Sequence, residues 1–580
     1  MDEVIVGIDF GSSGSGFAYA FKDNEKEIIN GYIPRANAID KVPSEIILDK
    51  NKETLRFGAE CKDFIRKNNL KECLYFKEIK MNLYEKKTEI QANNSEKKLP
   101  LKLVIQRVLE QLKDLAIKDI KTKHPNINNN NIKWVVTIPA IWEEFEKNIM
   151  MEACIKAGLI KEEDDKSLFF ALEPEAASYY CIENKSLDKN LMREGDCYII
   201  CDLGGGTGDI VTHLIGFNKS LKELCSPNGG KFGANEISRL FFEEIVYKIF
   251  KCKDFNTYYK KYMEAKEDCE DEGELFNDWL ELERQIKDFI EFTDLKKEKE
   301  YYPIIFDIFK DIFKDNTDIN DLVNNYNNNI DDNDLILKID EKSKRKWKIN
   351  FPHKIIFNFI KKQANLICEI IKNILKSSDE EIKSIIFVGG YSSNEILISE
   401  IKEQISSIFD IQFLRPPNQY LAVMRGAVSF GLDSNKIVQR KAKYTIGMNS
   451  YNIWKESLHS KKKGQKYYDE FGITYCKDCF KIFFKINQDL KLGQEIIKHC
   501  SMIYPRYSKI TFYKTLKENP IFIDEDGIEK IGEMTFDAEQ DYPPDQRHCI
   551  IIIRIGGTFY DIKVKHLNSA KILSTKFEFN

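Results

Sequence analysis

Two patterns of apolar and polar residues follow one another along this chain. In the first, apolar runs typical of buried strands alternate with helical periodicity, and in the second, short alternating segments predict strands without a long helix. The change falls near residues 437–445. We therefore expect an α/β part up to about residue 438 and an all-β part over 440–580. The predicted strands of the first part are 4–10, 133–139, 198–203, 209–215 and 384–388, and its helical stretches are 61–85, 101–120, 143–157, 235–300 and 353–376.

Two of the predicted turns join strands through small residues that follow an aspartate. One is CDLGGGTGDIV at 201–211, and the other is DFGSS at 9–13. Both have the same order of residues, which is an apolar strand, an aspartate, one apolar residue and then glycine or serine. The repetition suggests one half-domain that is used twice and faces itself across a cleft. Two unrelated glycine-rich hairpins with aspartates in their turns are the alternative.

The residue types of these turns suit a nucleoside triphosphate. Glycine lets backbone N–H groups approach phosphate oxygens, successive turn N–H groups form an anion-binding nest, and serine and threonine hydroxyls add donors. Aspartates do not bind phosphate directly, but Asp9, Asp202 and Asp209 can hold Mg²⁺ through its water shell. Because a strand and not a helix follows the glycines, neither a Walker loop nor a dinucleotide-binding fingerprint fits.

A third glycine turn lies near the end of the first part. Residues 384–405, SIIFVGGYSSNEILISEIKEQI, predict a strand, the pair Gly389 and Gly390, a polar turn and an amphipathic helix. A strand that runs into glycines at a helix N-terminus can hold the sugar or α-phosphate of a nucleotide. A plain strand-to-helix connection is the alternative.

Composition narrows the class of protein. The 580 residues are 42% hydrophobic and carry a net charge of −5 with both signs interspersed, which indicates packed cores and gives no electrostatic footprint for nucleic acid. The chain start does not fit a signal peptide, and no apolar run is long enough to predict a membrane span. The 14 cysteines are scattered, as free thiols in a reducing compartment are. We expect a monomer in the cytoplasm, with the nucleus as a second location, that binds neither nucleic acid nor membrane.

One cysteine pair is close enough in sequence to suggest chemistry of its own. Cys476 and Cys479 form a single CxxC, and neither His499 nor Cys500 lies at the spacing of a zinc ribbon. We interpret the pair as two ordinary thiols, with a zinc or redox site as the alternative. The basic run KSKRKWK at 342–348 is interpreted as a solvated segment rather than a nucleic-acid patch.

Four further segments connect the chain to a known family. They are FKEIKMNLY (76–84), WVVTIPAIW (134–142), ALEPEAASYYC (171–181) and GLDSNKIVQRKAKYTIGM (431–448). With the three glycine turns in this order, the chain resembles the actin-like ATPase superfamily and, within it, the divergent subfamily twelve of the heat shock protein 70 family. The similarity runs from about residue 3 to the C-terminus. It implies a two-lobed actin-like ATPase fold with duplicated ribonuclease-H-like halves over 1–438. A small β-sandwich that resembles a lidless substrate-binding domain follows over 440–580.

The resemblance also assigns roles around the phosphates. Gly11, Ser12 and Ser13 would hold the β-phosphate of ATP, and the γ-phosphate would meet Gly204, Gly205, Gly206 and Thr207. Asp9, Asp202 and Asp209 would organise Mg²⁺ and the attacking water. Glu173 would help to orient that water, with a plain helix-start carboxylate as the alternative.

Outside the glycine turns, three charged residues receive roles in the same way. Lys80 would contact phosphate, with an ordinary solvated lysine as the alternative. Glu283 and Lys287 would contact the ribose and adenine. Because these two residues are four apart on a predicted helix, a surface ion pair between them is the alternative.

The chain departs from that family at three points. Ser393 stands where the chaperones place an arginine against adenine, and no apolar interdomain linker is evident between Gly431 and Thr445. No helical lid follows the β-rich part. We therefore expect nucleotide binding to be retained and nucleotide-coupled peptide clamping to be weak.

The residues and the resemblance together predict a chaperone-like switch protein. It would bind ATP or ADP with Mg²⁺ and hydrolyse ATP slowly to ADP and phosphate, and its partners would be unfolded or extended polypeptides and co-chaperones. Two alternatives stay open. One is a pseudo-chaperone scaffold that binds nucleotide with little hydrolysis. The other is a small-molecule kinase of the same superfamily, which the β-rich tail and the LEPEAAS segment speak against.

Overall fold

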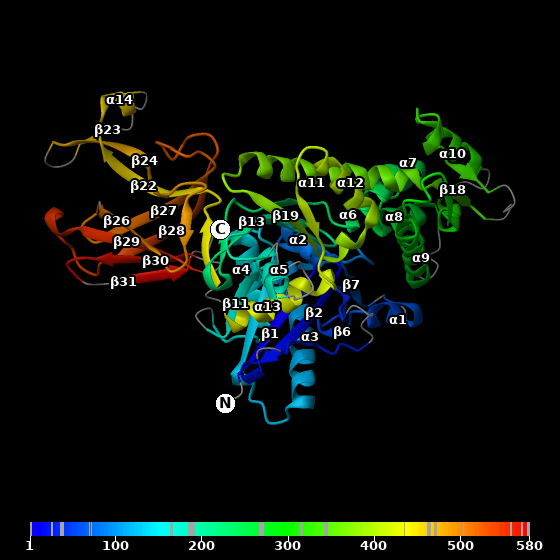
Figure 1. Cartoon of the computed structure of the whole chain (residues 1–580), viewed down its shortest axis with the longest axis horizontal. Coiled ribbons are helices and arrows are strands. Elements are labelled where there is room, and N and C mark those ends of the chain that lie inside the picture. The colour runs from blue at the N-terminus through cyan, green and yellow to red at the C-terminus, as the bar shows by residue number, and fades with distance from the viewer. Residues whose placement is uncertain are drawn as a thin grey trace.

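The chain mixes helices and sheets in its first part and is almost entirely β-structure after residue 441 (Figure 1). The structure is a computed structural model, and it describes residues 3–24, 27–34, 40–68, 70, 72–162, 166–183, 192–265, 272–313, 317–340, 346–433, 436–460, 466–468, 472–502, 504–556, 560–569 and 572–576. No helix within these ranges combines the length and the apolar character needed to cross a membrane.

The N-terminal hairpin forms the middle of the first sheet. β1 (Val4–Phe10) is buried along its whole length, as its apolar sequence predicts, and pairs antiparallel with β2 (Gly14–Phe21). On its other side, β1 runs parallel to β10 (Ile132–Ile138), which runs parallel to β11 (Leu168–Leu172). The short strands β3 (Ile29–Asn30) and β4 (Val42–Pro43) pair with β2.

The second sheet has the same pairing order around the hairpin of residues 197–215. β12 (Cys197–Leu203) pairs antiparallel with β13 (Gly208–Ile215), so that Asp202 lies opposite Asp209. β12 also runs parallel to β19 (Ile382–Val388), which runs parallel to β20 (Gln412–Leu414). β14 (Leu221–Glu223) and β15 (Asn228–Gly230) pair with β13. Each of the two sheets thus contains a hairpin followed by two parallel strands.

Two apolar cores hold helices against these sheets. In the first core, α3 (Leu101–Lys123), α4 (Glu144–Lys156), α5 (Glu173–Glu183) and α13 (Ala422–Leu432) surround β1 and β10. α13 and α5 approach so closely that a Cβ on Gly426 would lie 1.7 Å from the carbonyl oxygen of Ala176. The second core is rich in aromatic rings and holds α6 (Asn235–Phe241), α7 (Tyr247–Phe250), α8 (Phe255–Ala265), α9 (Glu272–Glu291), α10 (Ile319–Asn327), α11 (Lys354–Ser377) and α12 (Glu395–Ser406).

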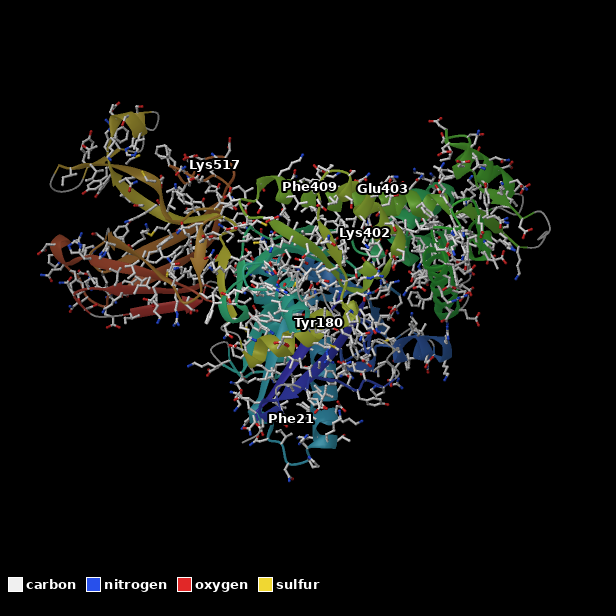
Figure 2. All side chains as sticks on the ribbon, in the orientation of Figure 1. Phe21, Tyr180, Lys402, Glu403, Phe409 and Lys517 are labelled. Atoms are coloured by element: carbon white, nitrogen blue, oxygen red, sulfur yellow. The ribbon has the colours of Figure 1, made fainter. Side chains whose placement is uncertain are left out.

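Side chains fill the space between these elements (Figure 2). Phe21 at the end of β2 packs against His124, with 4.0 Å between the ring centroids. The Tyr180 hydroxyl on α5 donates to the carbonyl oxygen of Pro417 at 2.7 Å. Both contacts join segments that are far apart in sequence.

The structure corrects the helical stretch predicted over 61–85. α1 (Glu60–Lys67) and α2 (Ile79–Tyr84) are helical, but β7 (Leu74–Phe76) lies between them and pairs with β5 (Ile46–Leu48). β5 also pairs with β6 (Thr54–Phe57). The strand forms because three consecutive apolar residues gain backbone partners in a remote segment, which outweighs the local helical periodicity.

The C-terminal part is built from two antiparallel sheets over one apolar core. The first sheet has the order β23 (Lys466–Tyr468), β24 (Thr474–Phe484), β22 (Thr445–Ile453), β27 (Tyr507–Thr515) and β28 (Ile528–Asp537). The second has the order β26 (Glu495–Ser501), β29 (His548–Ile555), β30 (Tyr560–His566) and β31 (Ile572–Lys576). The single-turn helix α14 (Glu456–His459) is an exception to the predicted all-β character.

The predicted boundary segment is itself a strand. β21 (Ile437–Lys441) runs parallel to β14 and pairs antiparallel with β25 (Asp489–Lys491), which comes from the C-terminal part. A segment without an apolar linker pattern is thus held by backbone hydrogen bonds on both of its sides. The second sheet is continuous from the first part of the chain into the C-terminal part.

Candidate functional site

The two aspartate–glycine turns meet face to face. We call residues 11–13 and 204–207 the facing turns. A Cβ added at Gly205 would lie 1.9 Å from the Ser13 hydroxyl oxygen, and one at Gly206 would lie 2.7 Å from that of Ser12. These distances are far below any normal contact, so the backbone of one turn lies directly against the side chains of the other. The structure thus brings the residues of these two turns together.

A segment that the sequence analysis missed supports the second of the facing turns. The N–H of Gly204 donates to the carbonyl oxygen of Thr207 at 3.0 Å, and the N–H of Asn235 donates to that of Gly205 at 2.7 Å. Asn235 also accepts a 3.0 Å hydrogen bond from the Ser13 hydroxyl, so it links both turns. A Cβ on Gly233 would lie 2.5 Å from the Gly205 backbone. In the sequence, the three glycines of GGKFGANE at 229–236 are the pattern that could have predicted this close approach to the turn.

Four carboxylates lie together beside these turns. Asp9, Glu173, Asp202 and Asp209 are all buried. Burial raises the pKa of Asp202 well above its usual range, with further increases from Glu173, Asp209 and Asp9. Burial and the charge of Glu173 raise the pKa of Asp209 to about 7. Burial and the mutual repulsion of these carboxylates thus both favour their protonated forms.

Two lysines neutralise part of that charge. Lys41, which the sequence analysis missed, pairs with Asp9 at 2.6 Å between Nζ and Oδ2. Lys80 is buried, forms an ion pair with Glu173, and lies 5.5 Å from the centre of the Trp142 ring. Burial raises the pKa of Glu173, and Lys80 counteracts part of this increase. The alternative of a solvated Lys80 is therefore wrong. Glu173 is the first residue of α5, and its role in orienting water stays a prediction.

The third glycine turn adjoins this carboxylate cluster. Gly389 has φ +84, and a Cβ there would lie 2.5 Å from Asp202 Oδ1, so only glycine fits. A Cβ at Gly390 would meet no atom within 4 Å, which leaves open space beside that residue. Ser393 donates to the carbonyl oxygen of Gly390 at 2.7 Å, and Arg415 donates to that of Ser392 at 3.2 Å. An arginine thus reaches this turn from beyond β20.

Glu283 and Lys287 do not pair with each other. Glu283 forms an ion pair with Lys77 and accepts a 3.0 Å hydrogen bond from the Trp279 ring nitrogen. Lys287 is exposed and lies 3.8 Å from Glu291. The predicted i,i+4 pair between Glu283 and Lys287 is therefore wrong, whereas their predicted nucleotide contacts stay predictions.

The carboxylate cluster fits a magnesium ion. Mg²⁺ prefers hard oxygen ligands and keeps much of its water shell, so it is held through one or two carboxylates and through water. Asp9 and Asp202 supply such oxygens next to the facing turns, and Glu173 and Asp209 are buried beside them. The residues present therefore suit Mg²⁺ together with a phosphate group.

This cluster makes the stability of the nucleotide-free chain depend on pH. Because the pKa of Asp209 rises from 3.8 to about 7 on folding, the folded chain holds a proton that the unfolded chain releases. The free energy of unfolding should therefore fall as pH rises from about 4 to about 7, by up to about 1.4 kcal/mol per pH unit. Thermal melts across this range measure the slope. Asp209→Asn should flatten the curve, and an unchanged slope in that variant would contradict the assignment.

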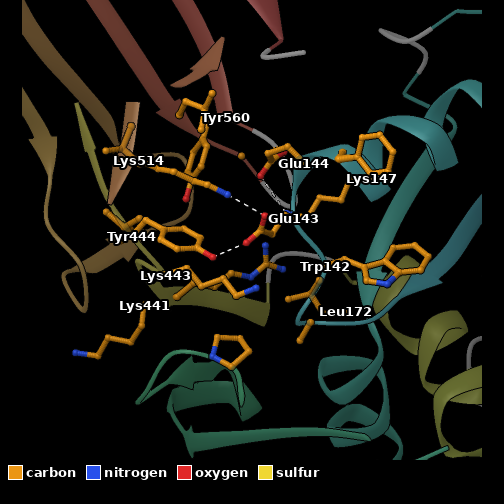
Figure 3. A pocket seen from close by; sticks show the side chains of 18 of the residues that line it. Trp142, Glu143, Glu144, Lys147, Leu172, Lys441, Lys443, Tyr444, Lys514 and Tyr560 are labelled. Atoms are coloured by element: carbon orange, nitrogen blue, oxygen red, sulfur yellow. Dashed lines mark hydrogen bonds and ion pairs between the residues drawn. The ribbon is translucent and has the colours of Figure 1, made fainter. Parts of the chain in front are cut away.

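The C-terminal part docks onto the first part beside a cavity of about 320 Å³. Figure 3 shows Glu143 of the first part between Tyr444 and Lys514 of the C-terminal part. Burial would raise the pKa of Glu143, but hydrogen bonds from Lys514, Lys86 and Tyr444 outweigh it and lower the pKa to about 2. Glu143 is therefore ionised and central to this contact.

A single residue, Ile141, connects this contact with the carboxylate cluster. The N–H of Ile141 donates to Asp209 at 3.1 Å, and its carbonyl oxygen accepts from Lys443 Nζ at 2.8 Å. Close by, Arg440 on β21 makes two 2.7 Å hydrogen bonds to Glu175, one to each carboxylate oxygen. Charged groups thus hold the boundary strand where the sequence lacks an apolar linker.

Glu143→Gln should loosen the C-terminal part. The substitution keeps the shape of the side chain but removes the charge that three donors share, so we expect a loss of about 1–3 kcal/mol in the free energy of unfolding. Chemical denaturation measures the loss, and hydrogen exchange should show faster exchange in β21 and β27. Glu144→Gln is the matched control, because Glu144 lines the same cavity and forms an ion pair with Lys147 at 3.3 Å. Equal losses in both variants would contradict the central role of Glu143.

Comparisons with known proteins agree with the resemblance seen in the sequence. Heat shock 70 kDa protein 12A of Homo sapiens is 25% identical over 99% of this chain and 90% of its own length. Heat shock 70 kDa protein 12B of Homo sapiens is 23% identical over 99% of this chain and 91% of its own length. A chaperone protein HscA homolog of Rickettsia prowazekii is 27% identical over 44% of this chain and 38% of its own length. No protein-family model matches the chain. Over nearly its whole length, the chain therefore resembles the divergent subfamily twelve of the heat shock protein 70 family.

Proposed function

We propose that this protein binds Mg²⁺–ATP between the facing turns and hydrolyses it slowly to ADP and phosphate. Residues 1–438 would form a two-lobed actin-like ATPase domain, and residues 440–580 a β-domain that resembles a substrate-binding domain. The observation that carries the proposal is the contact of Gly205 and Gly206 with Ser13 and Ser12 beside four buried carboxylates. The same pairing order in the two sheets supports it further.

In this proposal, the protein acts mainly by positioning groups. The N–H groups and hydroxyls of the facing turns would hold the phosphates, and the glycines leave the backbone accessible to them. Mg²⁺ would neutralise phosphate charge when it is bound. Asp209 would accept a hydrogen bond from the attacking water, and Lys80 would hold Glu173 in place through their ion pair. Hydrolysis needs little more than such positioning and charge stabilisation.

Single-turnover hydrolysis tests the proposal. Purified full-length protein in excess over radiolabelled ATP and Mg²⁺ should release phosphate in one slow exponential phase, which chelation of Mg²⁺ should abolish. Binding is measured separately by the rise in melting temperature that a ligand of the folded state causes. No rise in melting temperature at millimolar Mg²⁺–ATP would rule out the nucleotide assignment.

One observation favours the scaffold that binds nucleotide but scarcely hydrolyses it. Lys41 lies 2.6 Å from Asp9 and places a positive charge where Mg²⁺ would be held. A protein that uses lysine in this way would bind nucleotide with little dependence on Mg²⁺. Measuring ATP affinity with Mg²⁺ and with a chelator separates the ATPase from the scaffold. The same affinity under both conditions supports the scaffold.

We also propose that the β-domain contacts extended polypeptides through strand addition. β23 and β28 are the edge strands of its first sheet, and edge strands carry backbone groups that can pair with an added strand. We expect weak binding by strand addition to show as fast dissociation, because affinity differences lie mostly in the dissociation rate. Fluorescence anisotropy with labelled extended peptides, in ATP and in ADP, measures the binding and its coupling to nucleotide.

A further inference from the structure

Three ligand-forming side chains come together in the C-terminal part, apart from the facing turns. They are His459, at the end of α14, and Cys476 and Cys479 on β24; α14 lies at the upper left of the molecule (Figure 1). Their ligand atoms all lie within 4.8 Å of one another. All three residues are buried. In the part of the chain that the structure describes, no other group of histidine, cysteine and acidic residues has this geometry.

A bulge in β24 brings both thiols to the same side of the strand. In a regular strand, residues three apart point to opposite faces, because side chains alternate. Here Cys476 and Cys479 lie opposite Asn452 and Ser450 of β22, so β24 contains one extra residue. Asp478 has φ 58, which is the left-handed conformation that non-glycine residues seldom adopt. The local backbone is therefore shaped so that two sulfurs converge on one histidine.

Metal binding would replace hydrogen bonds that these groups make. The thiol of Cys479 donates to the carbonyl oxygen of Cys476, and that of Cys476 to the carbonyl oxygen of Lys477, each at 3.4 Å. Sulfur is a weak hydrogen-bond donor. Nδ1 of His459 accepts a hydrogen bond from the N–H of Lys455 at 2.9 Å. If Nδ1 binds the metal, this hydrogen bond is lost directly. If Nε2 binds it, Nδ1 carries the proton of the neutral ring and can no longer accept. In both cases two metal–thiolate bonds form in exchange.

Apolar rings surround the cluster. Cys476 and Cys479 pack with Phe522 and Trp454 in a small core of their own. The His459 ring lies 5.4 Å from the Trp454 ring and 6.0 Å from the Phe522 ring, measured between centroids. Such a shell limits access of water and orients the ligands, as it does around metal sites in general.

We propose that His459, Cys476 and Cys479 bind a soft divalent metal ion, of which Zn²⁺ fits best. Two sulfurs and one imidazole nitrogen are a zinc donor set, whereas magnesium and calcium prefer oxygen. On binding, each thiol releases its proton to solvent and a sulfur–zinc bond replaces each S–H bond. Water would complete a four-coordinate site. The metal would fasten α14 to β24 and stiffen this end of the sheet, independently of nucleotide.

This proposal revises the interpretation of the CxxC as two ordinary thiols. His499 and Cys500 are the potential ligands that follow the pair in the sequence. Those two residues lie on β26 in the other sheet, whereas His459 precedes the pair and reaches it from α14. Because His459 and the cysteine pair lie on different elements, their distance in sequence does not match a known zinc-site spacing.

Cobalt titration of the full-length protein tests the proposal. Metal-free protein, prepared with a chelator under reducing conditions, is titrated with Co²⁺ and then with Zn²⁺. We expect one equivalent of Co²⁺ to produce thiolate-to-cobalt absorption and strong tetrahedral visible bands, which Zn²⁺ then removes. Thermal melts of the metal-free and zinc-loaded protein should show a higher melting temperature with zinc.

Three variants identify the ligands. Loss of an outer-shell partner already costs about 10–100-fold in metal affinity, so Cys476→Ser should cost at least about 100-fold. His459→Asn should weaken binding and shift the visible bands. Cys500→Ser is the matched control, because Cys500 is a half-buried thiol on β26 outside the cluster, and it should bind like wild type.

Several outcomes would overturn the proposal. Wild-type protein that gives no thiolate–cobalt absorption has no such site. Unchanged spectra in His459→Asn would exclude the histidine as a ligand. A disulfide between Cys476 and Cys479, seen as a mass lower by two hydrogens in protein isolated without bound metal, would identify a redox pair instead. The wild-type titration and the histidine variant decide the matter even if Cys476→Ser does not fold.

Discussion

Gly205→Val is expected to abolish the stabilisation that Mg²⁺–ATP gives to the wild-type protein. A ligand that binds only the folded state at a concentration of 100 Kd stabilises it by about 2.7 kcal/mol. Because a Cβ at Gly205 would lie 1.9 Å from the Ser13 hydroxyl, the larger side chain forces the facing turns apart and fills the space proposed for phosphate. Differential scanning fluorimetry with and without millimolar Mg²⁺–ATP measures the loss.

The control for this substitution is the same change at the other end of β13. Gly216 follows that strand, and a Cβ there would lie 2.6 Å from the Ser220 hydroxyl, so the local crowding is similar. Gly216→Val should keep the full response to Mg²⁺–ATP. If both variants keep it, phosphate does not lie against Gly205. If both lose it, the loss reflects the fold and not the site.

Asp202→Asn and Glu173→Gln are expected to slow hydrolysis while leaving ATP binding nearly intact. Both substitutions keep the size of the side chain but remove a charge beside the facing turns. Loss of preorganised electrostatic stabilisation typically costs on the order of tenfold to a thousandfold in the chemical step. Single-turnover phosphate release measures the rate, and the shift in melting temperature with ATP measures binding in the same preparations.

A buried carboxylate at the opposite end of the same strand serves as the control. Asp196 immediately precedes β12, is buried, and pairs with Lys383 at 2.6 Å. Asp196→Asn removes a charge of the same kind away from the facing turns, so its hydrolysis rate should equal that of wild type. If wild type and all three variants hydrolyse ATP equally slowly, the result favours the scaffold that binds nucleotide with little hydrolysis.

The facing turns could be predicted from sequence because their chemistry is local. A buried strand, an aspartate and small residues occur within a few positions of one another, so the pattern at Asp9 and at Asp202 is visible without any tertiary information. The same holds for Gly389, where only glycine adopts the required backbone at little cost. Helices such as α3 and α11 were equally predictable, because their apolar positions recur at helical spacing.

The residues that sequence analysis missed all act across long distances in the chain. Lys41 reaches Asp9 from a separate loop, Asn235 links both facing turns from the start of α6, and Arg415 reaches the third glycine turn from beyond β20. Each is an ordinary polar residue in its own segment. Lys41 precedes β4 of the first sheet, and Arg415 follows β20 of the second, so strand pairing brings both to the site. Asn235 adds a contact between the two facing turns.

By itself, the sequence determined the two glycine turns with their carboxylates, the change from α/β to β character near residue 440, and the resemblance to one family. Tertiary structure alone decided that β21 joins the second sheet to the C-terminal part and that Glu143 is the charged centre of their contact. It also decided that His459 meets Cys476 and Cys479. The physical reason is the range of the interactions: periodicity and turn chemistry act between neighbours in sequence, whereas strand pairing, buried charge and metal ligation depend on which distant segments share a dry interior.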